Sequence, residues 1–190
     1  EQNIMTEKTD LRILKTYHAL IDAFEKMLEE QNYDDITVNS LCDFASIRRA
    51  TFYKHFSDKL EFTDFAASCL HENISKTCHA KADLHTYLSL YAASFFEYFK
   101  SHEAMVAHLL GSKDLFTLMQ SLENRICLGI REKLIASGEK LPAAPEITAM
   151  FYAGGLIQTV YTWLTAKRRV PEDKMLAEIT ALIDAVHAEA

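Results

Sequence analysis

The side chains best suited to chemistry lie in residues 48–59, where cationic, hydroxyl and aromatic groups alternate with apolar positions. These side chains are Arg48, Arg49, Thr51, Tyr53, Lys54, His55 and Lys59. Cations and hydroxyls bind phosphate oxygens, and an Arg can donate two hydrogen bonds to guanine O6 and N7. The segment therefore suits contact with a nucleic acid better than it suits a reaction centre.

A helix-turn-helix would hold these side chains on one surface. Thr37 can cap a first helix, because its hydroxyl accepts a backbone N–H that the first turn leaves unpaired. The apolar face of that helix consists of Val38, Leu41, Cys42 and Ala45. Residues 46–47 interrupt the pattern, and residues 48–56 resume it as a second helix. The buried positions of this second helix are Ile47, Phe52 and Phe56.

The segment 36–59 resembles the DNA-binding signature of the TetR (tetracycline-repressor) family of bacterial transcription regulators. The most diagnostic residues are Ile36, Thr37, Val38, Thr51, Phe52, Tyr53, Phe56 and Lys59. The sequence departs from the family pattern in the turn and at the start of the second helix. Ser46 stands where Gly is usual, Arg48 where a small hydroxyl residue is usual, and Ala50 where a second Gly is common.

The resemblance and the chemistry of the side chains together predict the DNA contacts. Phosphate contacts fit Thr37 and Lys59 at helix starts, and Tyr53 and His55 on the second helix. Base edges or phosphates are within reach of Arg48, Arg49, Thr51 and Lys54. The predicted DNA-binding set is Thr37, Arg48, Arg49, Ala50, Thr51, Tyr53, Lys54, His55 and Lys59.

Charge is distributed unevenly along the chain. The whole sequence carries −7, whereas residues 48–59 carry +3, which leaves −10 for the remainder. An acidic chain with one basic segment would meet DNA through that segment alone. The charge pattern therefore predicts local contact with double-stranded DNA.

Composition predicts an all-α fold of about nine helices. All five Gly and three Pro lie at or beyond Gly111, which favours long uninterrupted helices before that point. We expect a three-helix DNA-binding domain over residues 1–57, with the motif at about 37–56, and a helical ligand-sensing and dimerisation domain over residues 58–190. The expected helices are 9–31, 37–45, 48–56, a connector from 57 to at least 69, 83–99, 101–110, 115–138, 146–167 and one from 171 onward.

The second domain offers candidates for a ligand site and for a dimer interface. Most of its aromatic side chains are expected to form the core, but tyrosines inside a bundle can also line a cavity for a mostly apolar effector. The candidate ligand-binding residues are Tyr87, Tyr91, Phe95, Phe116, Met119 and Tyr152. The helix 146–167 has two apolar stripes, and a second copy of the chain could cover one of them. The candidate interface residues are Gly155, Thr159, Trp163, Ile179 and Ile183.

The function predicted is a ligand-responsive repressor that binds a palindromic operator as a homodimer, without a cofactor. An alternative is a regulator of the same fold that docks a partner protein instead of a small molecule. An enzyme is less consistent with the sequence, which has no Gly-rich phosphate loop, no Gly-x-Ser-x-Gly and no His-Glu-x-x-His.

Metal binding and membrane insertion are not expected. His71 and Cys78 share a helix face, but Cys69 and His79 do not join it, so no metal site is predicted. Residues 147–166 are uncharged but rich in Thr, which indicates a buried helix rather than a membrane span. The four cysteines form no Cys-x-x-Cys pair and no leader pattern is visible, so we expect a cytoplasmic protein.

Overall fold

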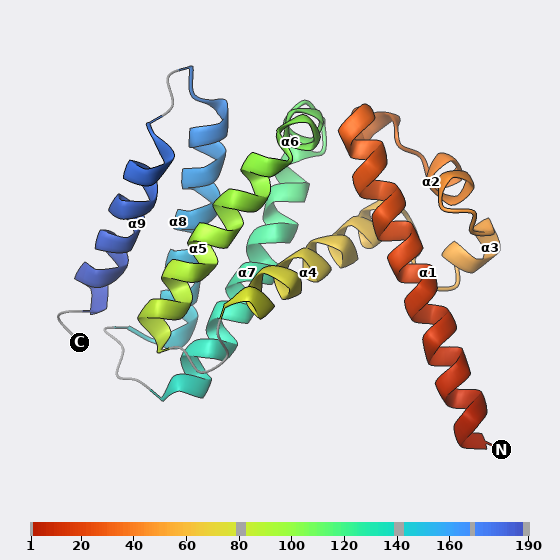
Figure 1. The fold of residues 1–190 in the computed structure, drawn as a ribbon, viewed down its shortest axis with the longest axis horizontal. Helices are drawn as coiled ribbons and strands as arrows, with labels where there is room; N and C mark the ends of the chain where they lie inside the picture. Colours follow the sequence, from red (N-terminus) through yellow and green to blue (C-terminus); the bar gives the residue numbers. More distant parts are fainter. Residues whose placement is uncertain (1, 79–82, 139–142, 168–169, 188–190) are drawn as a thin grey trace. The chain divides into compact units, whose positions relative to one another are not determined.

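The computed structural model describes residues 2–78, 83–138, 143–167 and 170–187, and these residues confirm the predicted all-α fold (Figure 1). Within these ranges there are nine α-helices, one 3-10 turn and no strand. The helices are α1 (Gln2–Glu30), α2 (Val38–Phe44), α3 (Arg49–Phe52), α4 (Lys59–Thr77), α5 (Leu84–Ser101), α6 (Glu103–Leu110), α7 (Leu115–Ser137), α8 (Pro145–Thr165) and α9 (Glu172–His187).

The chain divides into two compact units. The head unit contains Glu1–Ala66 and His102–Phe116, and the bundle unit contains Ala67–Ser101 and Thr117–Ala190. The helix α6 thus belongs to the head unit although it follows α5 of the bundle unit. A linear domain boundary after residue 57 stays a prediction.

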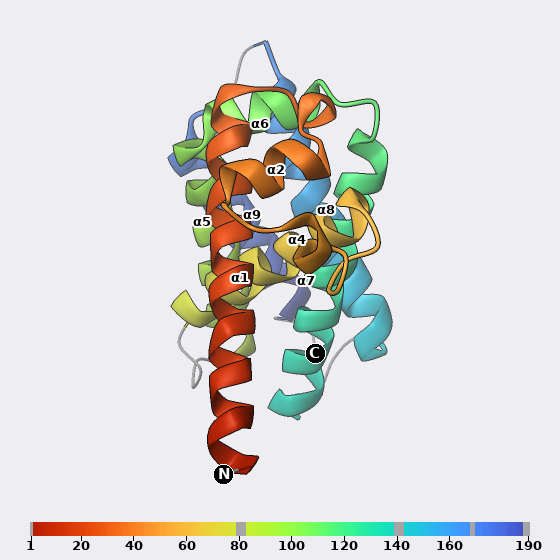
Figure 2. The ribbon, with the colours of Figure 1, turned by 90° about the vertical axis from the view of Figure 1, so that its right-hand side faces the viewer.

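Aromatic side chains form the core of the head unit. Phe24 of α1 packs edge-on against Phe62 of α4, with ring centroids 5.3 Å apart, and Phe52 and Phe56 lie within 6 Å of the same Phe62 ring. Phe52 and Phe62 are fully buried. Figure 2 shows α2 lying against one side of the long helix α1, and α3 packs in turn against α2. This core fixes the short helix α3, which is too short to be stable alone.

Both ends of α2 are capped by local hydrogen bonds. As predicted, Thr37 caps the first turn: the Ser40 amide donates to its hydroxyl at 3.0 Å, and the Thr37 amide donates to the Ser40 hydroxyl at 2.9 Å. At the other end the Ile47 amide donates to the Cys42 carbonyl and the Ser46 amide to the Asp43 carbonyl. This Schellman motif places Ser46 at a φ of 56°, where Gly is the usual residue.

Several expected helix boundaries are wrong. The helix α1 begins at Gln2 and not at residue 9. The helix α3 ends at Phe52, and single turns continue the chain to Phe56, as in the Phe56 amide that donates to the Phe52 carbonyl. The helix α4 begins at Lys59 and not at residue 57, and Asp58 caps it, because the Asp58 carboxylate accepts the Glu61 amide at 2.9 Å.

The bundle unit has one continuous apolar core built from α4, α5, α7, α8 and α9. Its centre includes Tyr91 and Phe95 of α5, Ile130 of α7, Ala153 of α8 and Ile183 of α9, which are at most 4% exposed. The long helices of this unit lie side by side in Figure 1. Among the residues described, no helix combines the length and the apolar character that a membrane span requires.

Candidate functional site

The turn before α3 and the α3 segment present a polar, partly cationic surface. Arg48 is the N-cap residue of α3, Arg49 is its first residue, and both are exposed together with Lys54. Tyr53 is 55% exposed, although its ring is packed edge-on against the buried Phe52. Thr37, at the start of α2, and Ala50 are also exposed, whereas Thr51 is half-buried. Most of the predicted DNA-binding set is therefore available to a partner.

Lys59 lies at the start of α4, and its ammonium group is bound within the protein. It donates to the backbone carbonyls of Tyr33 and Ile36 at 2.8 Å each, and it lies 3.9 Å above the centre of the Tyr33 ring. Burial lowers the pKa of this ammonium, and the nearby Asp34 carboxylate partly opposes that shift. These contacts give Lys59 a structural role. Its predicted phosphate contact stays a prediction.

His55 is half-buried and contacts α1. Its Nδ1 is 3.2 Å from the Tyr17 hydroxyl, and the two rings meet edge to face. This bond ties the end of the α3 segment to the long first helix. His55 therefore positions the segment whether or not it also contacts a phosphate.

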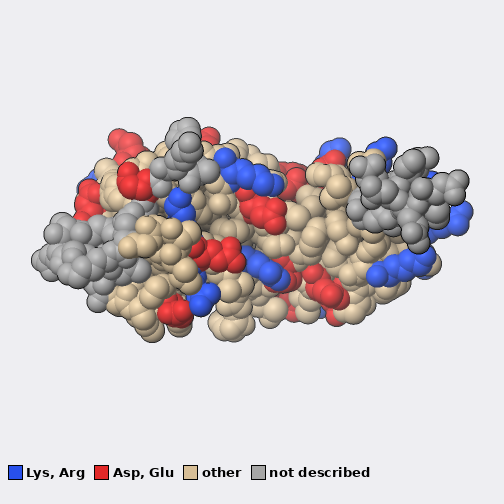
Figure 3. All heavy atoms as spheres, turned by 90° about the horizontal axis from the view of Figure 1, so that it is seen from below, with Lys and Arg blue, Asp and Glu red and all other residues tan. Residues whose placement is uncertain are grey.

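Figure 3 shows one face of the molecule, on which several Lys and Arg side chains lie toward its right-hand end. Acidic and basic side chains are interspersed over the rest of this face. The positive charge is therefore local: residues 48–59 carry +3, and the remainder of the chain carries −10.

A second anchoring contact in the head unit joins residues that are far apart in the sequence. The Asp34 carboxylate accepts the Ser112 hydroxyl at 2.7 Å and the Lys113 amide at 3.2 Å, and these bonds lower the Asp34 pKa. Beside it, Nδ1 of His108 in α6 is 2.7 Å from the carbonyl of Leu28 near the end of α1. Sequence reasoning missed these contacts, because a separation of 78 to 80 residues leaves no local pattern.

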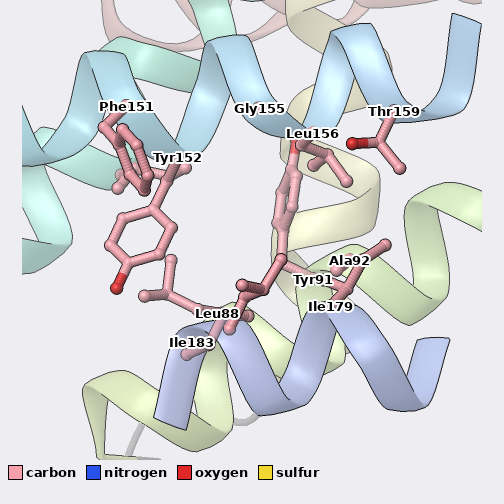
Figure 4. Close-up of a pocket in the computed structure, with 12 residues that line it drawn as sticks. Leu88, Tyr91, Ala92, Phe151, Tyr152, Gly155, Leu156, Thr159, Ile179 and Ile183 are labelled. Carbon is pink, nitrogen blue, oxygen red and sulfur yellow. The ribbon is translucent and has the colours of Figure 1, made fainter. Parts of the chain in front are cut away.

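An apolar pocket of about 160 Å³ lies in the bundle unit, with walls from α5, α7, α8 and α9 (Figure 4). Its walls are Leu88, Tyr91, Ala92, Ile130, Phe151, Tyr152, Gly155, Leu156, Thr159, Ile179, Leu182 and Ile183. Among these described residues none carries a formal charge. Phe151 and Leu182 are about two-thirds exposed, at 67% and 68%, so the pocket opens to the surface.

The candidate ligand residues divide between this pocket and other places. Tyr91 and Tyr152 line the pocket. Tyr87 and Phe95 are buried in the core on either side of Tyr91, and Met119 packs against the same core. Phe116 belongs to the head unit and is 77% exposed. The spacing of the aromatic residues thus predicted two of the residues that line the pocket. It could not show which helix faces pack too loosely to close the space between them.

Tyr91 links the pocket to α4. Its hydroxyl is 2.7 Å from Nδ1 of His71, and the ring centroids are 5.5 Å apart. Burial raises the pKa of Tyr91 and lowers that of His71. The His71 ring lies against Gly129 of α7, where a Cβ would overlap the imidazole. Gly129 is therefore required for the observed position of His71.

The candidate dimer residues are also divided. Gly155 is exposed and Thr159 half-buried, so both have surface available to a partner. Trp163 and Ile183 are only 7% and 4% exposed within their own chain, and Ile179 packs on the same core. The Trp163 indole packs against Phe96 and donates to the Val170 carbonyl at 2.8 Å. The exposed apolar residues of α8 are instead Ile147, Met150 and Phe151.

Two of the side chains considered for a metal, those of His71 and Cys78, have other contacts. His71 contacts Tyr91, and the Cys78 thiol lies 3.4 Å from the Ile74 carbonyl. His79 is outside the described residues. Within the described ranges no group of three or more His, Cys, Asp or Glu side chains could hold a metal ion.

The fold and the exposed α3 surface define a DNA-binding transcription regulator. A family model described as a transcriptional regulator C-terminal region, of the TetR type, matches residues 86–185, which is more than half of the chain. The chain belongs to the TetR family of transcription regulators.

A curated relative is similar over a short region. A stretch of 56 residues is 41% identical to the uncharacterized HTH-type transcriptional regulator YxbF of Bacillus subtilis (strain 168). The match covers 29% of this chain and 15% of that protein, so the chain spans only a small part of this relative.

Solved structures show the same fold over most of the chain. A TetR transcriptional regulator from Streptococcus agalactiae 2603V is 21% identical, with a TM-score of 0.56 over 94% of this chain and 98% of that one. The TetR family repressor AlkX from Dietzia sp. strain DQ12-45-1b, implicated in biodegradation of n-alkanes, is 16% identical, with a TM-score of 0.64 over 90% and 95%. The fatty acid degradation regulator FadR from Bacillus halodurans is 15% identical, with a TM-score of 0.61 over 88% and 93%.

Proposed function

We propose that this regulator is a ligand-responsive, non-enzymatic repressor that binds a palindromic operator as a homodimer in the cytoplasm. The observation that carries the proposal is the surface around α3. Arg48, Arg49 and Lys54 are exposed there, while Phe52 and Phe56 hold the segment against the aromatic core. A rigid, cationic segment of this kind can enter a major groove and contact base edges there.

The DNA contacts follow from the geometry of that surface. Arg48 and Arg49 are candidates for guanine contacts, and Thr37, Tyr53 and Lys54 for phosphates. His55 and Lys59 have partners inside the head unit, so we propose that they chiefly position the others. An ordered reading surface loses less conformational entropy on binding than a disordered one.

The apolar surface of α8 supports the proposed homodimer. Ile147, Met150 and Phe151 are 58%, 60% and 67% exposed and lie on successive turns, followed by the exposed Gly155. A contiguous exposed apolar surface is typical of an interaction site, and a two-fold dimer would present two α3 segments to two half-sites. The same surface would also suit a different protein, which is the alternative function.

Selection of bound fragments from genomic DNA, followed by footprinting and sedimentation of the complex, tests the proposal. We expect a protected palindrome with two protomers and half-site centres about 34–36 Å apart or a multiple of that distance. Arg49→Ala should bind the selected site more weakly. One isolated protomer on a fully protected site would contradict the homodimer, and a purified chain that stays monomeric at all concentrations would favour the partner-protein alternative.

A further inference from the structure

The short helix α3 lies at the outer edge of the head unit (Figure 1). Phe52 is fully buried and Phe56 is 5% exposed, so these residues mark the side of the α3 segment that faces the core. On a helix, the residues two positions before and two positions after a given residue lie on the opposite side of the axis. For Phe52 these residues are Ala50 and Lys54, and both are exposed. Ala50 and Lys54 therefore point most directly away from the core of the head unit.

Arg48 and Arg49 lie on opposite sides of the line from Ala50 to Lys54. The Arg49 carbonyl accepts the Tyr53 amide at 2.9 Å, and the Arg48 carbonyl accepts the Thr51 amide at 2.8 Å. Each Arg thus lies one turn before the residue whose amide it accepts. Because Thr51 and Tyr53 are on either side of Phe52, the two guanidinium groups extend in different directions.

Both guanidinium groups are available to a ligand. Arg48 and Arg49 are exposed, and within the described ranges neither side chain forms a hydrogen bond or an ion pair. His55 and Lys59 of the same region, in contrast, are bound inside the head unit. Phe52 packs into the aromatic core and holds the backbone of α3 in place. Two unpaired cations therefore extend from a backbone that is already ordered.

The side chain of Ala50 determines how closely α3 can approach the floor of a major groove. Its methyl group is short, so the helix backbone can come near the base pairs. A methyl group forms no hydrogen bond, and the apolar group that the major groove offers is the C5-methyl group of thymine. At that depth a long Arg side chain on either side reaches O6 and N7 of a guanine in a neighbouring base pair.

We propose that α3 reads, in each half-site, a T·A base pair that lies between two G·C base pairs. Ala50 contacts the thymine methyl group, and Arg48 and Arg49 each donate two hydrogen bonds to one of the two guanines. This proposal rests on the proposed function, because it names the base pairs that the DNA-binding surface recognises. Arg48 and Ala50 are positions at which the sequence departs from the family pattern, so this base preference belongs to the chain and not to the family.

Selection of binding sites from a library of random duplexes by the full-length protein tests the base pattern. We expect each selected half-site to contain a thymine with a G·C base pair on either side. Half-sites that lack this triplet would overturn the proposal and leave the proposed function intact. Failure of the protein to enrich any duplex would contradict the proposed function, and this proposal with it.

Base analogues in the selected duplex test each contact without any change in the protein. Deoxyuridine in place of the central thymidine removes only the methyl group and should weaken wild-type binding about fourfold for each half-site. Deazaguanine, in which carbon replaces N7, removes one acceptor of the Arg pair and should weaken binding about tenfold at either guanine. Deoxyuridine outside the protected region is the control and should have no effect. An affinity that neither analogue changes inside the half-site would overturn the proposal.

Protein variants assign each contact to its residue. Ala50→Gly has no methyl group to place against the thymine, so it should bind the thymidine and deoxyuridine duplexes equally. Arg48→Ala should lose the sensitivity to deazaguanine at one guanine, and Arg49→Ala should lose it at the other. Each variant is compared on modified and unmodified duplexes, so a change in its own stability cancels.

Lys54→Met is the matched control, because it removes a cation from the same exposed surface. It should bind every duplex more weakly but keep the sensitivity to each analogue. Arg48→Ala and Arg49→Ala variants that both keep the deazaguanine effects would overturn the assignment of the guanines. An Ala50→Gly variant that still distinguishes thymidine from deoxyuridine would overturn the role of Ala50.

Discussion

Ser46 adopts a backbone conformation that is unfavourable for its residue type. Its φ of 56° closes the Schellman motif at the end of α2, and it sets the direction in which the chain enters α3. The left-handed conformation costs an L-residue roughly 1–2 kcal/mol, whereas Gly adopts it readily. The greater entropy of Gly in the unfolded chain offsets part of this gain.

We therefore expect Ser46→Gly to raise the free energy of unfolding by about 0.5–1 kcal/mol. Urea denaturation of the wild type and the variant measures the change. Ser57→Gly is the matched control, because Ser57 is also exposed and its φ is not positive, and it should not stabilise the protein. A destabilised Ser46→Gly would show that the serine side chain contributes more than its strained backbone costs.

Through His71, the stability of the bundle unit should depend on pH. Burial is the main reason that its pKa lies below 6.5, and the carboxylates of Glu72 and Glu132 oppose that shift. Below pH 6.5 the unfolded state therefore binds protons that the folded state does not, so stability is complete above that value and falls as pH decreases toward the folded pKa.

We expect the urea midpoint of the wild type to decrease as the pH falls below about 6.5, and the decrease to be smaller in His71→Gln. His18 is exposed, so His18→Gln is the control and should keep the wild-type dependence. Equal slopes in the wild type and His71→Gln would mean that the buried imidazole is not the group responsible.

At the scale of elements, the sequence predicted what local patterns determine. The capping hydroxyl of Thr37 predicted the start of α2, and the spacing of Phe52 and Phe56 predicted the buried side of the α3 segment. Long-range contacts were not predictable in this way. The placement of α6 in the head unit depends on Asp34 and Ser112, which are 78 residues apart.

The candidate site illustrates the same limit. The exposed cations of the α3 segment followed from residue type and spacing. The bonds from Lys59 to the carbonyls of Tyr33 and Ile36 did not, because they join α4 to a turn that lies more than 20 residues earlier in the chain. The pocket walls come from four helices, so they could not be derived from the aromatic spacing within α5 alone.

Lys54 and Lys59 offer a comparison between two cations of neighbouring elements. Lys59→Met removes two charge-assisted hydrogen bonds to carbonyls that lie beneath the start of α4, so we expect a loss of about 2–3 kcal/mol in the free energy of unfolding. Lys54 is exposed, and Lys54→Met should leave stability nearly unchanged while it weakens DNA binding. Urea denaturation and DNA titration of both variants measure the two effects. Equal stability of the two variants would contradict the structural role of Lys59.

At the scale of the whole molecule, a charge on the apolar surface of α8 should oppose self-association. Met150 is 60% exposed, so Met150→Glu should fold normally in the monomer but introduce an unpaired charge into a dimer interface. Sedimentation over a range of concentrations should show a weaker dimer. Leu11→Glu, at a residue of the head unit that is 58% exposed, is the matched control and should sediment as the wild type does.

In the proposed homodimer, the measured DNA affinity depends both on dimerisation and on the contacts of each protomer with DNA. The salt dependence of that affinity separates the two contributions. Each phosphate contact that a Lys or Arg makes releases counterions, so the slope of log affinity against log salt reports how many such contacts exist. Arg49→Ala should lower the affinity for the selected site. A salt-dependence slope reduced by about 1 for each head unit would show that Arg49 contacts a phosphate. An unchanged slope with a relaxed sequence preference would show that Arg49 contacts a base. Met150→Glu should behave differently. The salt-dependence slope for each bound dimer should stay the same. DNA binding should become steeply dependent on protein concentration, because the weakened dimer must form before it binds DNA. If Met150→Glu instead reduced the slope in the manner of Arg49→Ala, the surface of α8 would be contacting DNA itself, and the dimer interface would have to lie elsewhere.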